Sequence, residues 1–136
     1  MAADAPATAL GPFRVTVDAD KVAAFARETG FAALPTGRVP LAFPATWLAA
    51  PVIRAALAQA CAEADSVPFH EQQKFSYAAP LRMGESYDLA VTMRRRDAPA
   101  RLVLEARMTT SDGDEVAQIE TLMRLAPRSL LKASDA

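Results

Sequence analysis

The strongest constraint on the fold is a regular alternation of apolar and polar side chains in the C-terminal half of the chain. In residues 86–95, for example, Leu89, Val91 and Met93 stand at every second position, and the positions beside them include the polar residues Asp88, Thr92 and Arg94. Such a period of two gives a strand one apolar face and one polar face. The pattern is found in residues 74–78, 86–95, 101–110 and 115–125. Short, turn-like segments join the last three of these, so we expect an antiparallel meander.

The N-terminal half has helical spacing instead. We expect a short strand over residues 13–17, followed by a helix that Asp18 caps and Gly30 ends. Residues 31–44 contain three prolines and one glycine, and this composition predicts a loop.

An alanine-rich segment follows in residues 45–64. Pro51 suits the first turn of a helix, where its missing N–H costs nothing, so we expect a short turn and then a helix of about fifteen residues. Few charges interrupt this segment, which predicts a helix surrounded by protein rather than solvated on one face. Since a sheet with one apolar face needs a cover, the expected fold is α+β, with the sheet wrapped around this central Ala-rich helix.

Composition limits the compartment and the partners. The 136 residues suit one domain, placed at residues 13–126 between a disordered N-terminus, residues 1–12, and a flexible tail, residues 127–136. A net charge of −1 gives no reason to expect binding to nucleic acid or to a membrane surface. No apolar run approaches the ~20 residues that span a bilayer. A single cysteine, Cys61, suits a reducing compartment, so we expect a cytoplasmic protein.

Several stretches resemble a known family: VDADKVAAFARETG at residues 17–30, VPLAFPATWL at 39–48, FHEQQKFSYAAPLRMGESYDLAV at 69–91 and SDGDEVAQIETLMRL at 111–125. The most specific piece is F-x-Y-x-x-P-L-x-x-G-[DE], here Phe75 to Glu85. Together they are similar to the MaoC-like acyl dehydratases and (R)-specific enoyl-CoA hydratases, particularly their N-terminal-type domains. The resemblance implies a hot-dog fold, a dimer joined edge to edge, and a pocket near the subunit interface. The ligand would be an acyl thioester on CoA or acyl carrier protein, with no cofactor.

The catalytic motif of that family is the main departure. Active members carry D-x-N-P-[LI]-H directly after the Thr-Gly that ends the first helix, and the Asp and His exchange protons with the acyl chain. Here Thr29-Gly30 is present, but Phe31 takes the place of the Asp and Thr36 that of the His. Since neither side chain is an effective acid or base at neutral pH, we expect a degenerate active site.

Three functions remain open. We favour a substrate-binding or structural subunit that forms a heterodimer with a catalytic MaoC-like subunit. The second is a homodimeric acyl-thioester binding module without catalysis. The third is an atypical hydratase or thioesterase that uses His70 and Glu71. Adjacent residues on an extended segment point to opposite faces, however, and a histidine at a strand entry more simply bonds a loop carbonyl.

Five apolar side chains are candidates for the wall of an acyl site: Phe43, Trp47, Ile53, Phe75 and Tyr77. Aromatic side chains at such spacing also serve as plain core. The run of arginines at residues 94–96 could meet the phosphates of a CoA, or could be a solvated strand end. Glu63 and Asp65 fall at the end of the expected helix, away from the start or middle where thioesterases of this fold place a carboxylate. With one His and one Cys, no metal site is expected.

Overall fold

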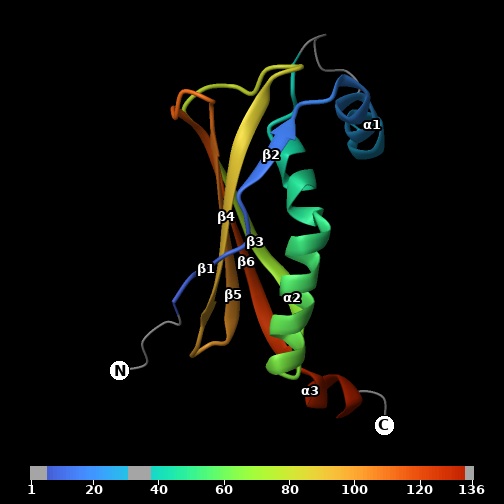
Figure 1. Cartoon of the computed structure of the whole chain (residues 1–136). Coiled ribbons are helices and arrows are strands. Elements are labelled where there is room, and N and C mark those ends of the chain that lie inside the picture. Colours follow the sequence, from blue (N-terminus) through green and yellow to red (C-terminus); the bar gives the residue numbers. More distant parts are fainter. Residues whose placement is uncertain (1–5, 31–37, 134–136) are drawn as a thin grey trace.

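The computed structural model describes residues 6–30 and 38–133 of the chain (Figure 1). In chain order the elements are β1 Thr8–Ala9, β2 Phe13–Thr16, α1 Ala19–Thr29, the 3-10 helix η1 Phe43–Ala49, α2 Pro51–Glu63, β3 Ser66–Tyr77, β4 Ser86–Arg96, β5 Arg101–Thr109, β6 Glu115–Pro127 and α3 Arg128–Ala133. The expected α+β class is confirmed.

All the strands belong to one antiparallel sheet in the order β1-β4-β5-β6-β3. The short strands β1 and β2 pair with successive parts of β4, so they lie end to end along one margin of the sheet. The long strand β3 forms the other margin and pairs only with β6 among the described strands. The expected meander of the last three strands is confirmed by the β4–β5 and β5–β6 registers.

The core lies between this sheet and α2, which runs along one of its faces (Figure 1). Leu89 of β4, Met108 of β5 and Ile119 of β6 are buried on that face. They meet Ile53 of α2 and Phe43 of η1, which are also buried. The alternation in the sequence therefore identifies the face of the sheet that the helix covers.

Local signals fixed both ends of α1. Asp18 Oδ1 accepts hydrogen bonds from the backbone N–H groups of Asp20 at 2.8 Å and Lys21 at 3.1 Å. Gly30 ends the helix with φ +83°, a left-handed conformation that favours glycine. Pro51 opens α2, and η1 precedes it, as the sequence predicts.

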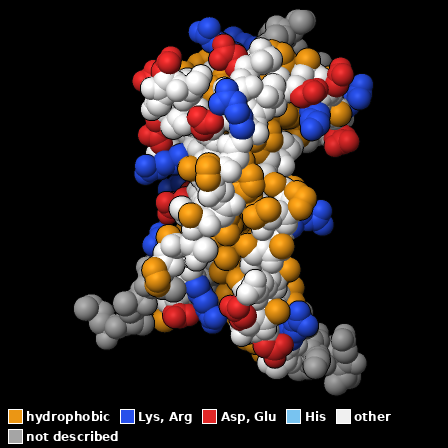
Figure 2. All heavy atoms as spheres, in the orientation of Figure 1, with side chains coloured by type: hydrophobic (Ala, Val, Ile, Leu, Met, Phe, Trp, Pro, Cys, Tyr) orange, Lys and Arg blue, Asp and Glu red, His pale blue; other side chains and the backbone are white. Residues whose placement is uncertain are grey.

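The expectation that α2 is surrounded by protein is wrong for the single chain. Ile53 and Cys61 are buried, whereas Ala55 and Ala58 are exposed on the opposite face. Figure 2 shows hydrophobic side chains gathered along this part of the surface, with acidic and basic side chains toward its two ends. Because alanine is small and apolar on every side of the helix, composition alone does not say which side is covered.

Three other segments differ from the sequence interpretation. The strand expected over residues 74–78 begins eight residues earlier, at Ser66. A bulge between His70 and Gln72 interrupts its register and with it the alternation that would have revealed it. At the ends of the chain, Thr8–Ala9 pairs with β4 where the sequence predicts disorder, and Arg128–Ala133 forms α3 where it predicts a flexible tail. Residues 1–5 and 134–136 lie outside the described residues.

Candidate functional site

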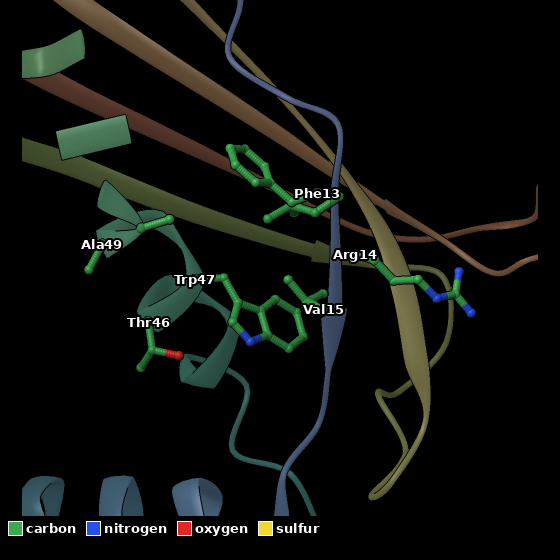
Figure 3. Close-up of a pocket in the computed structure, with 8 residues that line it drawn as sticks. Phe13, Arg14, Val15, Thr46, Trp47 and Ala49 are labelled. Carbon is green, nitrogen blue, oxygen red and sulfur yellow. The ribbon is translucent and has the colours of Figure 1, made fainter. Parts of the chain in front are cut away.

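A pocket of about 330 Å³ lies between β2 and η1, at the margin of the sheet opposite to β3 (Figure 3). Its lining residues are Phe13, Arg14, Val15, Thr46, Trp47, Ala49, Ala50 and Leu89. Leu89 is 1% exposed and closes the pocket on the β4 side, whereas Thr46 and Ala49 are exposed and mark its mouth. The pocket is thus an apolar hollow that opens to solvent beside η1.

A ladder of three aromatic rings fixes the helical wall of this pocket. The ring centroids of Phe25 and Phe43 are 5.7 Å apart, and those of Phe43 and Trp47 are 5.8 Å apart. Both pairs meet edge to face, the arrangement that the charge distribution of aromatic rings favours. Because Phe43 is 1% exposed and cannot move freely, it holds the Trp47 indole in place.

The structure separates the five candidate wall residues into three places. Phe43 and Ile53 are buried in the core, and Trp47 lines the pocket beside β2. Phe75 and Tyr77 lie on β3, at the far margin of the sheet, where each is partly buried against the core. Of the five side chains, Trp47 alone lines the pocket beside β2.

Tyr77 has a defined polar role at the end of β3. Its hydroxyl donates a hydrogen bond to the backbone carbonyl of Leu41, just before η1. Desolvation by burial raises the pKa of Tyr77 to about 12, so the phenol remains a neutral donor at physiological pH. Leu41 itself is 66% exposed, which leaves an apolar side chain beside the end of this strand.

His70 and Glu71 lie at the bulge of β3, and neither lines the pocket beside β2. His70 is exposed and is in register with Met123 of β6. Glu71 instead forms an ion pair with Arg101 of β5, with 3.1 Å between Glu71 Oε2 and a guanidinium nitrogen. Since the carboxylate already has a partner, the two neighbours do not form an acid–base pair in this chain.

The arginine run is partnered by acidic side chains. Arg94 pairs with Glu105 at 3.4 Å, and Arg95 pairs with Asp97 at 3.3 Å. A phosphate would have to compete with these carboxylates, so the run is not a ready-made anion site.

Other site types find no support in the described residues. Within residues 6–30 and 38–133, no three His, Cys, Asp or Glu side chains converge as metal ligands would. No single helix of that part is long and apolar enough to cross a membrane; η1 and α2 pass such a test only as a pair bent by 65°. Phe31 and Thr36, at the positions of the family's Asp and His, lie outside the described residues.

Comparison with known proteins was informative only at the level of structure. No family model matches the chain, and no curated protein sequence matches it either. Among solved structures, a HadBC (3R-hydroxyacyl-ACP dehydratase) complex from Mycobacterium tuberculosis has a chain that is 18% identical, with a TM-score of 0.60. The match covers 90% of this chain and 99% of that one.

Two further structures agree. The (R)-hydratase from A. caviae involved in PHA biosynthesis is 18% identical, with a TM-score of 0.53 over 91% of this chain and 97% of that one. A hot-dog-like protein from Thermanaerovibrio acidaminovorans is 14% identical, with a TM-score of 0.52 over 96% and 88%. This chain has the hot-dog fold. The fold expected from the sequence is confirmed, and α2 is the central helix of the hot-dog.

The sequence interpretation missed most of the pocket beside β2. Phe13, Val15 and Leu89 line it, and only Trp47 was recognised as a candidate. The alternation of β2 shows that Phe13 and Val15 share a face, but nothing in the sequence says that β2 pairs with β4. An alignment of the N-terminal strand with that of other hot-dog proteins would have indicated this pairing.

Proposed function

We propose that this hot-dog protein is a MaoC-like, dehydratase-related subunit that binds an acyl thioester but supplies no acid–base pair. In this proposal it acts in the cytoplasm, beside a second hot-dog subunit that carries the catalytic Asp and His. The acyl-thioester site is placed at the β3 margin, where Phe75 and Tyr77 contribute apolar surface and the partner completes the pocket. CoA and acyl carrier protein are both possible carriers of the acyl group.

The observation that carries the proposal concerns the side chains that could transfer protons, His70 and Glu71. The sequence has one histidine, and it lies exposed at the bulge of β3, while its neighbour Glu71 is bound to Arg101. The segment that bears the Asp and His in the similar family reads Phe31-Ala-Ala-Leu-Pro-Thr36. Hydration of an enoyl thioester needs a base for water and an acid at Cα, and loss of one positioned group costs about 10²–10⁴-fold.

The open margin of the sheet supports a partner. Strand β3 has twelve residues and pairs with β6 on one side only within the described chain. Such an edge presents unpaired backbone groups that can pair with another strand. Phe69 on this strand is 49% exposed, and Leu41 next to Tyr77 is 66% exposed. Backbone pairing and apolar contact would thus act together at this margin.

The proposal is tested by reconstitution. The chain is purified alone and together with a hot-dog subunit that bears D-x-N-P-x-H, and hydration of an enoyl-CoA is assayed. We expect no enzyme-like turnover by the chain alone, and a stable heterodimer with altered activity or acyl-chain preference when the partner is present. Enzyme-like turnover by the isolated chain would contradict the proposal.

A matched pair of variants tests the contact surface. Phe69→Lys places a charge on β3, whereas Leu130→Lys places one on α3, where Leu130 is 64% exposed. We expect native mass spectrometry to show loss of the heterodimer for the first variant alone. If the chain instead forms ligand-bound homodimers without activity, it is a binding module. If hydration activity is found and His70→Ala abolishes it, His70 is the catalytic base.

A further inference from the structure

We infer that the pocket between β2 and η1 is a separate binding site for an aliphatic chain with a polar head. It goes beyond the proposed function, because the acyl-thioester site proposed above lies at β3. Strand β2 is separated from β3 by four strand-to-strand steps through β4, β5 and β6, which amounts to roughly 19 Å. The two sites therefore occupy opposite margins of one sheet.

The chemistry of the wall selects an apolar occupant. Six of the eight lining residues are apolar and none is a carboxylate; the apolar ones are Phe13, Val15, Trp47, Ala49, Ala50 and Leu89. The one charged lining residue, Arg14, is bound to Asp88 of β4 at 3.0 Å, and its side chain points away from the cavity in Figure 3. Water in this hollow would find few hydrogen-bond partners, so an apolar ligand that displaces it gains free energy.

The pocket is also shaped in advance, which lowers the entropic cost of binding. On the η1 side, the edge-to-face contact with Phe43 holds Trp47. On the β2 side, the ring of Phe13 folds back over Gly11, and a Cβ at Gly11 would lie 2.8 Å from two ring atoms of Phe13. Glycine at this position therefore permits the observed place of the Phe13 ring.

The exposure of the lining residues determines which way an amphiphilic ligand would lie in the pocket. Buried Leu89 closes the inner end, and the exposed Thr46 and Ala49 stand at the mouth. A ligand would place its apolar tail inward and its head near the Thr46 hydroxyl. Because Asp88 neutralises Arg14, the mouth does not select an anionic head. The volume of about 330 Å³ is about twice that of a 150 Å³ cavity that binds benzene, which suits a chain of medium length.

The sole tryptophan of the chain makes occupancy directly measurable. Trp47 lines the pocket, so its fluorescence reports a bound ligand without any added probe. The full chain is titrated with decanoic acid below its micelle-forming concentration, and in parallel with decanol. We expect a saturable change in Trp47 emission, with dissociation constants that agree within about threefold for the two ligands, because the neutralised mouth does not favour the charged head.

Three variants locate the site. Ala49→Phe fills the mouth at an exposed position, and we expect affinity to fall about tenfold or more, which corresponds to the loss of only two buried methylenes. Gly11→Ala displaces the Phe13 ring, so it should also lower the affinity. Ala58→Phe, on the exposed face of α2, is the control and should leave the affinity unchanged.

The outcomes separate this site from the proposed function. Unchanged Trp47 emission, or an equal effect of Ala49→Phe and Ala58→Phe, overturns the inference. Acyl-CoA binding seen by calorimetry, together with unchanged Trp47 emission on titration with decanoic acid and decanol, overturns the inference while the proposed function stands. Decanoic acid bound at Trp47, with no acyl-CoA binding by the chain together with its partner subunit, supports the inference and contradicts the proposed function.

Discussion

Replacement of Phe43 tests whether the ring contacts among Phe25, Phe43 and Trp47 stabilise the fold. The side chain is 1% exposed and lies between Phe25 and Trp47. Phe43→Ala leaves a cavity that the surrounding residues fill only in part, and such truncations cost about 3–5 kcal/mol in free energy of unfolding. For a domain with a typical stability of about 5–15 kcal/mol, this is a large fraction of the total.

Phe43→Leu separates the cavity from the ring geometry. Leucine retains much of the apolar volume but removes both edge-to-face contacts, each worth about 0.5–1.5 kcal/mol beyond the buried area. Two such contacts predict a loss of about 1–3 kcal/mol. The alanine variant should therefore be clearly less stable than the leucine variant, and the leucine variant clearly less stable than the parent.

Urea unfolding followed by circular dichroism measures both variants without relying on Trp47, whose emission the substitution itself would alter. Leu130→Ala is the control, because Leu130 is 64% exposed and its truncation should change stability by less than about 0.5 kcal/mol. A leucine variant as stable as the parent would show that the ring contacts contribute nothing. An alanine variant that loses less than about 1 kcal/mol would refute the assignment of Phe43 to the core.

Three further results are expected. Asp18→Ala removes the N-cap of α1 and should cost about 0.5–2 kcal/mol in urea unfolding, whereas Asp18→Asn should restore most of it. Burial holds the pKa of Tyr77 at about 12, above its ordinary value of 10.0, so its contribution to stability is complete below pH 10.0 and is lost as the pH rises to about 12. Tyr77→Phe should remove this part of the alkaline destabilisation, seen in unfolding curves against pH, and an unchanged profile would contradict it. Cys61 is 6% exposed, and burial raises the pKa of its thiol, opposed by the charge of Arg128. A thiol reagent should therefore label the native protein more slowly than the unfolded chain, and equal rates would contradict this.

Short sequence motifs were sufficient to predict the ends of α1, the start of α2 and the buried face of β4. Asp18 and Gly30 bound α1, Pro51 opens α2, and the alternation of Leu89 with its neighbours fixes the buried face of β4. Each of these signals depends on residues close together in the sequence, so the physics is visible without the fold.

The parts that were missed depend on contacts between distant segments. Phe13 and Leu89 meet in one pocket because β2 pairs with β4, more than seventy positions further along the chain, and no residue type announces that pairing. The first half of β3 was missed for a different reason. Its bulge after His70 and its run of exposed side chains from Pro68 to Gln72 remove the period of two on which strand prediction rests. Ile53 was expected at a ligand wall but is buried in the core, since apolar character does not distinguish a core from a pocket.

The unequal margins of the sheet also bear on how far association can proceed. One margin consists of β1 and β2, which are two and four residues long and are separated by a Gly-Pro step. Short, broken strands offer a poor template for a further chain, whereas the continuous β3 offers a good one. Among the described strands, β3 alone therefore offers a long edge at which another molecule could add in the plane of the sheet. Two molecules that meet through it present only the blunted margins outward, so the geometry favours a closed pair and disfavours a fibre.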